Sequence, residues 1–323
     1  MPKTTEYHHD WAEMAFGSKK PLKDLRAIFI AAPRAISPKR FNQLLKAYLP
    51  KGNVVLGIAK EPYVVGLENQ KAFSMLQLSA VQPTIEKINA ASPTHKVRTL
   101  SYFQRDLCHL LEKLAFSKAI FIRGSWYHAF HLRPEFYTLI NLRIPYQTIS
   151  PFSDEAEAKA YAQAYVPAVP QLPSRPVDEK TMLELAQVAA SQSFAYSEHQ
   201  TGIALGRRQG KGYQAVTTAF NRVVPYQTFA MHFGASREDN FSPMNDLNHY
   251  DASHAEVELL VQALHDGTRL VGTTLFINVM PCPTCARMLT ATDIDEIVYQ
   301  QDHSGGYAIR LLTEAGKKVR RVV

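Results

Sequence analysis

One histidine, one glutamate and two cysteines have the types and the spacing of a catalytic metal site. They occur in the segments His254-Ala255-Glu256 and Pro281-Cys282-Pro283-Thr284-Cys285. One imidazole and two thiolates supply three ligands to a zinc ion, and a tetrahedral ion then keeps one position for water, as catalytic sites require. A glutamate two residues after the histidine is suited to carry a proton. The pattern predicts a water-activating zinc site with His254, Cys282 and Cys285 as ligands and Glu256 as the catalytic residue.

Both parts of this motif fall where helices are expected to begin. Ser253 is expected to cap one helix, and Pro281 is expected to open the next, since proline is tolerated at the first position. Cys282 and Cys285 are three residues apart, so they share a face of the first turn, where free amides and the helix dipole favour thiolates. The apolar residues expected on one face of the first of these helices are Val257, Leu260, Val261 and Leu264.

A structural zinc site is the alternative interpretation. It requires a fourth protein ligand, and the chain has three cysteines in total. Cys108 lies beside the leucines of a predicted helix and is expected to be a buried thiol. The remaining candidates, His232, His249 and His303, lack the usual ligand spacing. The sequence therefore favours a catalytic zinc site over a structural one.

Charge is distributed unevenly along the chain of 323 residues, which is long enough for two domains. Residues 1–173 carry 22 basic against 13 acidic side chains, whereas residues 174–323 carry 14 against 16. A basic half attracts phosphates, nucleotides or nucleic acid, although a solvated lysine-rich surface explains the same counts. The scarcity of cysteine, the lack of a signal peptide and the lack of an apolar run of about 18 residues predict a cytoplasmic protein without a membrane span.

Four prolines, spaced three residues apart between 167 and 177, predict a stiff extended linker between two domains. Residues 1–166 are then a basic domain in which apolar runs alternate with helical spacing, as in a Rossmann-like α/β fold with a parallel sheet. It lacks the glycine-rich dinucleotide and phosphate-loop motifs. Its strands are predicted at 27–32, 54–58, 96–100, 119–122 and 146–149.

Residues 178–323 form the second predicted domain, with the element order αββαβαβαβ. A helix of about ten residues separates its last two strands. A helical crossover joins parallel strands, whereas antiparallel neighbours usually need only a short turn. We therefore expect a three-layer αβα domain whose last two strands are parallel.

Residues 178–323 resemble the cytidine and deoxycytidylate deaminase superfamily. The resemblance rests on the H-x-E and P-C-x-x-C segments, which are typical of zinc nucleobase deaminases, and on Ile297-Val298-Tyr299 and Leu312-Thr313-Glu314-Ala315-Gly316. The helical crossover is similar to that of the deoxycytidylate and tRNA-adenosine branch. The resemblance implies one zinc ion per chain, a homo-oligomer, and Asn221 and Tyr299 as nucleoside contacts. Taken by themselves, Asn221 is equally explained as a turn residue and Tyr299 as a core aromatic residue. Ala255 and Arg222 are further substrate-binding candidates, with the guanidinium suited to a 5′-phosphate.

The segment 225–250, between the second strand and the zinc helix, is expected to be a long loop, which is either functional or disordered. Its Arg237 is a second candidate for the phosphate. The leading hypothesis is a deaminase that converts dCMP to dUMP. The rival is a polynucleotide deaminase, acting on tRNA adenosine or single-stranded cytosine, that binds nucleic acid through the basic half. In a third hypothesis the zinc half is an inactive scaffold, which the intact motif disfavours.

Overall fold

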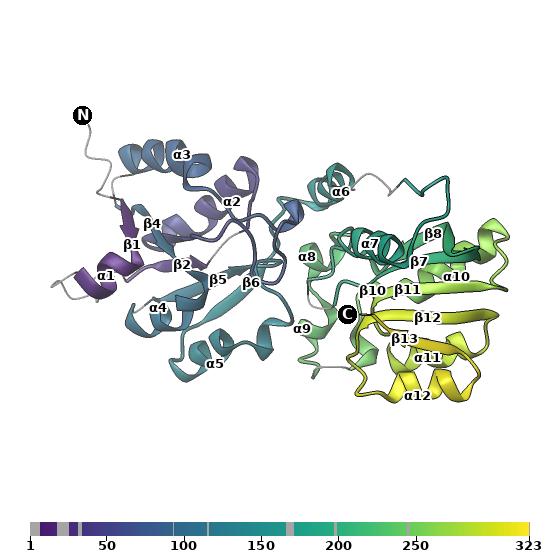
Figure 1. Cartoon of the computed structure of the whole chain (residues 1–323). Helices are drawn as coiled ribbons and strands as arrows, with labels where there is room; N and C mark the ends of the chain where they lie inside the picture. Colours follow the sequence, from purple (N-terminus) through teal and green to yellow (C-terminus); the bar gives the residue numbers. More distant parts are fainter. Residues whose placement is uncertain are drawn as a thin grey trace. The chain divides into compact units, whose positions relative to one another are not determined.

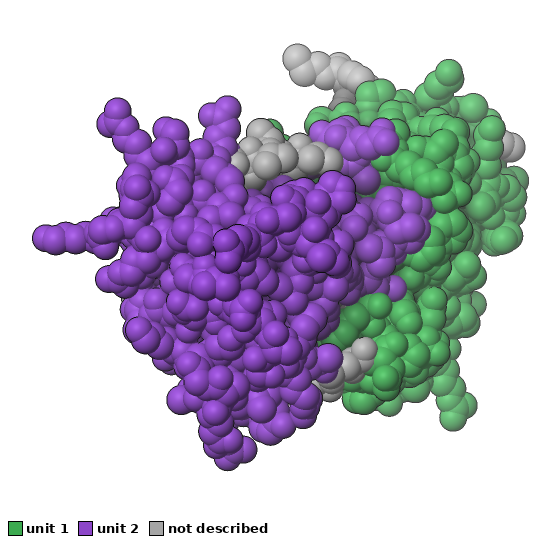
Figure 2. Space-filling view, turned by 90° about the vertical axis from the view of Figure 1, so that its right-hand side faces the viewer, with its two compact units in different colours: residues 1–161, 196–198, 228–250 green, residues 162–195, 199–227, 251–323 purple. Residues whose placement is uncertain are grey.

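The computed structural model describes residues 7–17, 26–31, 34–92, 94–114, 116–165, 171–196, 199–243 and 246–322. The chain divides into two compact units, coloured separately in Figure 2. Unit 1 comprises Met1–Tyr161, Tyr196–Glu198 and Thr228–Tyr250, and unit 2 comprises Ala162–Ala195, His199–Gln227 and Asp251–Val323. The chain therefore passes between the units several times, whereas the sequence predicted one passage at 167–177. Two of the linker prolines, Pro167 and Pro170, lie outside the described residues.

Unit 1 is built on a parallel sheet with the strand order β1-β4-β3-β2-β5-β6. Figure 1 shows α2 and α3 on one face of this sheet and α4 and α5 on the other. The predicted strands are all present, and the sequence missed β1 and α1. The strands are β1 (His8–Asp10), β2 (Ile28–Ala31), β3 (Val54–Ala59), β4 (Val97–Tyr102), β5 (Lys118–Ile122) and β6 (Tyr146–Ile149). The helices are α1 (Trp11–Gly17), α2 (Pro38–Tyr48), α3 (Leu78–Ala91), α4 (Leu107–Lys113), α5 (Pro134–Asn141) and α6 (Glu155–Ala164).

The order of strands in unit 1 reverses between β2 and β5. After β2 the chain adds β3 and β4 on one side, and it then returns to place β5 and β6 on the other. In open α/β sheets, ligands bind outside the carboxyl ends of the strands at such a reversal.

Unit 2 is a five-stranded sheet with the order β13-β12-β11-β7-β8. As the helical crossover predicted, β13 runs parallel to β12. Three helices bury residues such as Leu259, Leu289 and Leu312 in one core cluster, and α7 contributes Met182 and Ala186 to another. The strands are β7 (Gly202–Gln209), β8 (Gly212–Phe220), β11 (Thr273–Val279), β12 (Ile294–Gln301) and β13 (Lys318–Arg321). The helices are α7 (Glu179–Ala190), α10 (Ala255–Asp266), α11 (Pro283–Thr290) and α12 (Tyr307–Glu314).

The face of α10 that packs in the core differs from the predicted one. Val261 and Leu264 were expected on the apolar face, yet they are 61% and 85% exposed. The buried face instead carries Ala255, Glu256, Leu259 and Ala263. The apolar residues of α10 are numerous enough to define two stripes, and the requirement to turn Glu256 inward selects the other one.

Residues 225–250 were expected to be a loop without regular structure, and residues 228–250 of that segment are here called the insertion. They contain two short helices, α8 (Phe229–Phe233) and α9 (Ser236–Asp239), and a 3₁₀ turn, Leu247–His249. A two-stranded antiparallel ribbon, β9 (Arg222–Val223) with β10 (Ala252–Ser253), joins the chain before the insertion to the chain after it. The insertion belongs to unit 1, although unit 2 precedes and follows it in the sequence.

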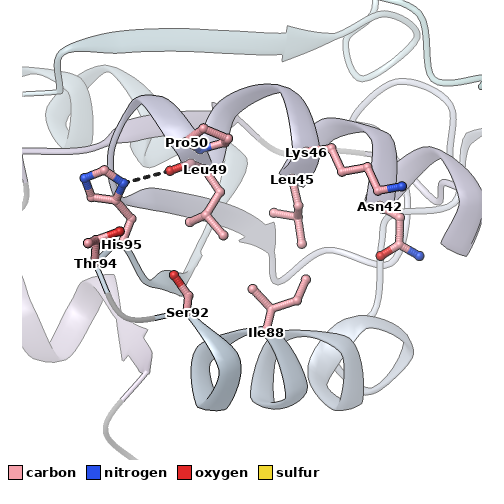
Figure 3. Close-up of a pocket in the computed structure, with 9 residues that line it drawn as sticks. All are labelled: Asn42, Leu45, Lys46, Leu49, Pro50, Ile88, Ser92, Thr94 and His95. Carbon is pink, nitrogen blue, oxygen red and sulfur yellow. Dashed lines mark hydrogen bonds between the residues drawn. The ribbon is translucent and has the colours of Figure 1, made fainter.

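An open groove of about 660 Å³ lies between α2 and α3 of unit 1. Figure 3 shows Leu45 and Ile88 directed toward each other across it, with Lys46 and Asn42 at one end. At the other end, Nδ1 of His95 is 2.9 Å from the carbonyl oxygen of Leu49. The groove contains none of the predicted site residues.

No helix in the described part of the chain combines the length and the apolar character needed to cross a membrane.

Candidate metal centre

The three predicted ligands lie close enough together to share one ion. Nδ1 of His254 is 3.6 Å from Sγ of Cys282 and 3.4 Å from Sγ of Cys285, and all three donor atoms lie within 4.8 Å of one another. Donor atoms bound to one tetrahedral zinc at about 2.0–2.3 Å lie roughly 3.5–3.8 Å apart. The donor set and its spacing therefore fit a zinc ion with three protein ligands.

Two helix starts position these ligands. His254 is the N-cap residue of α10, immediately after β10. Cys282 is the N-cap residue of α11, and its sulfur accepts a hydrogen bond of 3.4 Å from the backbone amide of Cys285. Pro283 occupies the first turn of α11, where its missing amide costs nothing. The amino ends of both helices carry partial positive charge, which favours thiolates beside them.

The two thiols interact strongly with each other. A hydrogen bond from Cys285, followed by contact with His254, lowers the pKa of Cys282 to about 4. The same pairing raises the pKa of Cys285, since a second thiolate beside the first is repelled and burial adds to the cost. One thiolate therefore forms readily, and a cation shared by both sulfurs is needed to hold the second.

Glu256 lies in the first turn of α10 and is 3% exposed. Burial raises the pKa of its carboxyl to about 7, and its interaction partners include the thiol of Cys285 and the ring of His254. A carboxyl group beside the metal ligands, with a pKa near neutrality, is suited both to accept and to donate a proton.

Asn221 uses its side chain within the fold of unit 2. Its Oδ1 accepts a hydrogen bond of 2.8 Å from the amide of Thr201, and its Nδ2 donates one of 2.9 Å to the carbonyl of His199. The residue is 4% exposed. These bonds connect the chain after β8 to the chain before β7, a role that the sequence did not reveal.

The other predicted substrate contacts have different surroundings. Arg222 forms a half-exposed ion pair of 3.2 Å with Glu258 of α10. Ala255 is fully buried at the start of α10, next to the ligand His254. Tyr299 of β12 is 5% exposed within the core cluster of unit 2, and burial raises the pKa of its hydroxyl.

Arg237 belongs to the fold of the insertion, which corrects its predicted assignment to a substrate phosphate. It is 4% exposed and donates hydrogen bonds to the carbonyl oxygens of Pro243 and Asp246. Two of the histidines considered as a fourth metal ligand are also held elsewhere, since His232 contacts Ser150 and His249 contacts Ser236. Across the ranges that the structure describes, the potential metal ligands gather only at His254, Cys282 and Cys285.

Comparison with known proteins agrees with this geometry. Residues 176–301 match the family model described as the cytidine and deoxycytidylate deaminase zinc-binding region. The matched part contains all three ligands and Glu256, so the family match and the donor set both indicate zinc as the metal of this site. The resemblance inferred from the two motifs is thereby confirmed.

More distant similarities cover shorter segments or are weaker. Deoxycytidylate deaminase of Enterobacteria phage T2 is 33% identical over 46 residues, which are 14% of this chain and only 24% of the phage enzyme. The dCMP deaminase of cyanophage S-TIM5 is 16% identical, with a TM-score of 0.32, over 44% of this chain and 95% of its own. A tRNA:A34 deaminase structure is 19% identical, with a TM-score of 0.28, over 44% of this chain and 92% of its own.

Proposed function

We propose that this protein is a zinc-dependent hydrolytic deaminase of a cytosine nucleotide, with dCMP as the substrate and dUMP and ammonia as the products. The observation that carries the proposal is the meeting of three metal donors, rather than four, with a buried carboxyl beside them. A structural zinc site would saturate the ion with protein ligands and would have no use for Glu256.

The reaction replaces the exocyclic amine of the base with oxygen from water. A zinc ion held by this donor set supplies Lewis-acid activation of the attacking water. Glu256 accepts the proton that this water loses, and it passes protons to the ring nitrogen and to the departing amine, which leaves as ammonia. Burial of Glu256 supports both roles, because it keeps the protonated and ionised carboxyl close in free energy.

Several finer assignments belong to the same proposal. Arg222, at the base of the insertion, is the proposed contact for the 5′-phosphate, and Glu258 orients its guanidinium. Asn221, Ala255 and Tyr299 are proposed to line the nucleoside site, with Asn221 acting through its bonds to the 199–201 segment. We also propose a cytoplasmic homo-oligomer, as the family resemblance implies.

A direct assay separates the substrates. The purified zinc-loaded chain is incubated with dCMP, cytidine, dCTP and single-stranded oligonucleotides, and ammonia release is followed. We expect turnover of dCMP above the others. Turnover of oligonucleotides alone would replace the proposal with the polynucleotide hypothesis, which the excess of 22 basic over 13 acidic residues in 1–173 favours. Turnover of none would refute the deaminase.

Glu256→Gln tests the proton carrier. It keeps the size of the side chain and removes the ionisable oxygen, so kcat should fall by about 10²- to 10⁴-fold. Zinc content should stay the same, because Glu256 is not among the ligands. Glu184→Gln, an exposed carboxyl of α7, is the matched control and should keep full activity. Full activity of Glu256→Gln would show that another group carries the proton.

A further inference from the structure

Arg34 is a buried cation without a buried anion. It is 0% exposed and follows β2 at the carboxyl edge of the unit 1 sheet. Among the residues that the structure describes, no ion pair involves Arg34. Its Nε is buried and has no hydrogen-bond partner. Charged side chains are rarely buried unless they are paired, since desolvation of the charge is costly.

The side chains that the structure shows in contact with the Arg34 guanidinium are neutral. One of its terminal nitrogens donates to the sulfur of Met231, and the other donates to the hydroxyl of Tyr161 at 2.8 Å. Its carbon lies 5.5 Å and 5.1 Å from the ring centres of Phe73 and Tyr161. A thioether is a weak acceptor, and cation–π contacts offset only part of the desolvation. Among the described residues, no carboxylate pairs with the Arg34 guanidinium, whereas Arg123 nearby interacts with the buried carboxyl of Glu238.

A second guanidinium lies at the end of the neighbouring strand. Arg123 follows β5, and its Nη1 donates to the carbonyl oxygen of His232 at 2.9 Å, while its Nε is also buried without a partner. Gly124, with φ of +74°, lies against Arg34, because a Cβ added there would be 3.1 Å from Nη1 of Arg34. The two cations therefore flank β2 and β5, where the strand order of the sheet reverses.

The short helix α8 of the insertion covers both cations. Met231 and His232 are consecutive residues of α8, and they contribute the sulfur to Arg34 and the carbonyl to Arg123. The carboxyl end of a helix carries partial negative charge, so α8 is a weak substitute for an anion. A separate cavity of about 20 Å³, enough for a single water molecule, is lined by Ala31 of β2, Phe121 of β5 and the buried Glu135.

We propose that the carboxyl edge of the unit 1 sheet binds a phosphate-bearing ligand through Arg34 and Arg123, and that α8 moves aside to admit it. Two guanidinium groups match the oxygens of a phosphate, and the reversal between β2 and β5 is where open α/β sheets bind ligands. Arg34 is fully buried and Met231 of α8 lies against its guanidinium, so a ligand reaches this group only if α8 moves. The ligand is either free phosphate or a nucleotide. This site does not depend on the proposed deaminase activity.

Calorimetric binding tests the proposal on the full zinc-loaded chain, with inorganic phosphate, pyrophosphate and ATP as separate probes. We expect at least one of them to bind, and Arg34→Met to weaken that binding by more than about tenfold, the size of one lost charge-assisted hydrogen bond. Arg105→Met removes an exposed cation of unit 1 and should leave the affinity unchanged. Binding of ATP without binding of inorganic phosphate identifies a nucleotide site, and binding of all three identifies a phosphate site.

Met231→Ala gives a result in the opposite direction. It removes the sulfur that covers Arg34, so α8 becomes easier to displace and the affinity should rise. Hydrogen exchange of the Phe229–Phe233 amides should also become faster when the ligand binds. Three results would each overturn the proposal: no probe binds the wild-type chain, Arg34→Met binds as well as Arg105→Met, or Met231→Ala leaves the affinity unchanged. The last of these decides the matter if Arg34→Met does not fold.

Discussion

Glu238 of α9 is a carboxyl group from whose raised pKa we predict a loss of unit 1 stability as the pH increases. Its Oε1 accepts hydrogen bonds from Nε1 of Trp126 at 2.6 Å and from the amide of Phe130 at 3.0 Å. Its Oε2 is buried without a partner, although the residue as a whole is partly exposed. Burial raises the pKa of the carboxyl from 4.5 to about 7, against the opposing effect of these bonds and of Arg123.

The sign and size of the effect follow from this pKa. Below pH 4.5 the carboxyl is protonated in the folded and the unfolded chain, and it costs nothing. As the pH rises toward 7, the unfolded chain loses the proton more readily, so stability falls. Above pH 7 the loss is complete and amounts to about 3 kcal/mol, at 1.36 kcal/mol for each pKa unit. Glu238→Gln keeps the acceptor oxygen and removes the ionisation, so it should abolish this loss.

Urea unfolding followed by tryptophan fluorescence measures it, because Trp11 and Trp126 both lie in unit 1 and are the only tryptophans of the chain. At about pH 4, below both pKa values, the wild type and Glu238→Gln should be almost equally stable. At pH 8 the variant should be more stable by up to about 3 kcal/mol. Glu112→Gln, an exposed carboxyl of α4, should follow the wild type. Equal pH dependence of the wild type and Glu238→Gln would refute the reasoning.

Three further changes test the core and the metal centre of unit 2. Leu259→Ala empties a fully buried position of α10 and should cost about 2–5 kcal/mol of unfolding free energy, whereas Leu264→Ala, 85% exposed on the same helix, should change it by about 0.5 kcal/mol or less. Cys282→Ser should lose zinc and activity together, measured by metal analysis and ammonia release, while Cys108→Ser should keep both. Asn221→Ala leaves two backbone groups unpaired and should lower the unfolding free energy by about 1–3 kcal/mol, which a residue that contacts only substrate would not do.

The metal ligands were predictable because their chemistry is local. Cys282 and Cys285 share one turn of α11, and a side chain at an N-cap position has a fixed relation to the helix that follows. His254 and Glu256 lie together at the start of α10 for the same reason. The alternation of strands and helices was also predictable from the sequence, because buried parallel strands are continuous apolar runs and the chain between them usually forms a helix.

The remaining features depend on contacts between distant parts of the chain. Glu238 meets Trp126, 112 residues earlier, and His131 meets Ser242, 111 residues later. No local pattern in the insertion indicates such partners, so it was interpreted as a loop. The same limit explains Arg237, whose charge suggested a phosphate contact and whose hydrogen bonds instead close the fold of the insertion.

The ribbon of β9 and β10 holds the two ends of the insertion together directly before the metal ligand His254. Val223 pairs with Ala252 and Arg222 with Ser253, so the two ends of the insertion are held side by side. The two ends of the insertion are therefore brought together at the ribbon. The entropic cost of holding them together grows only slowly with the length of the insertion. His254 follows the ribbon directly, so its position is set by β9 and α10 rather than by the sequence of the insertion.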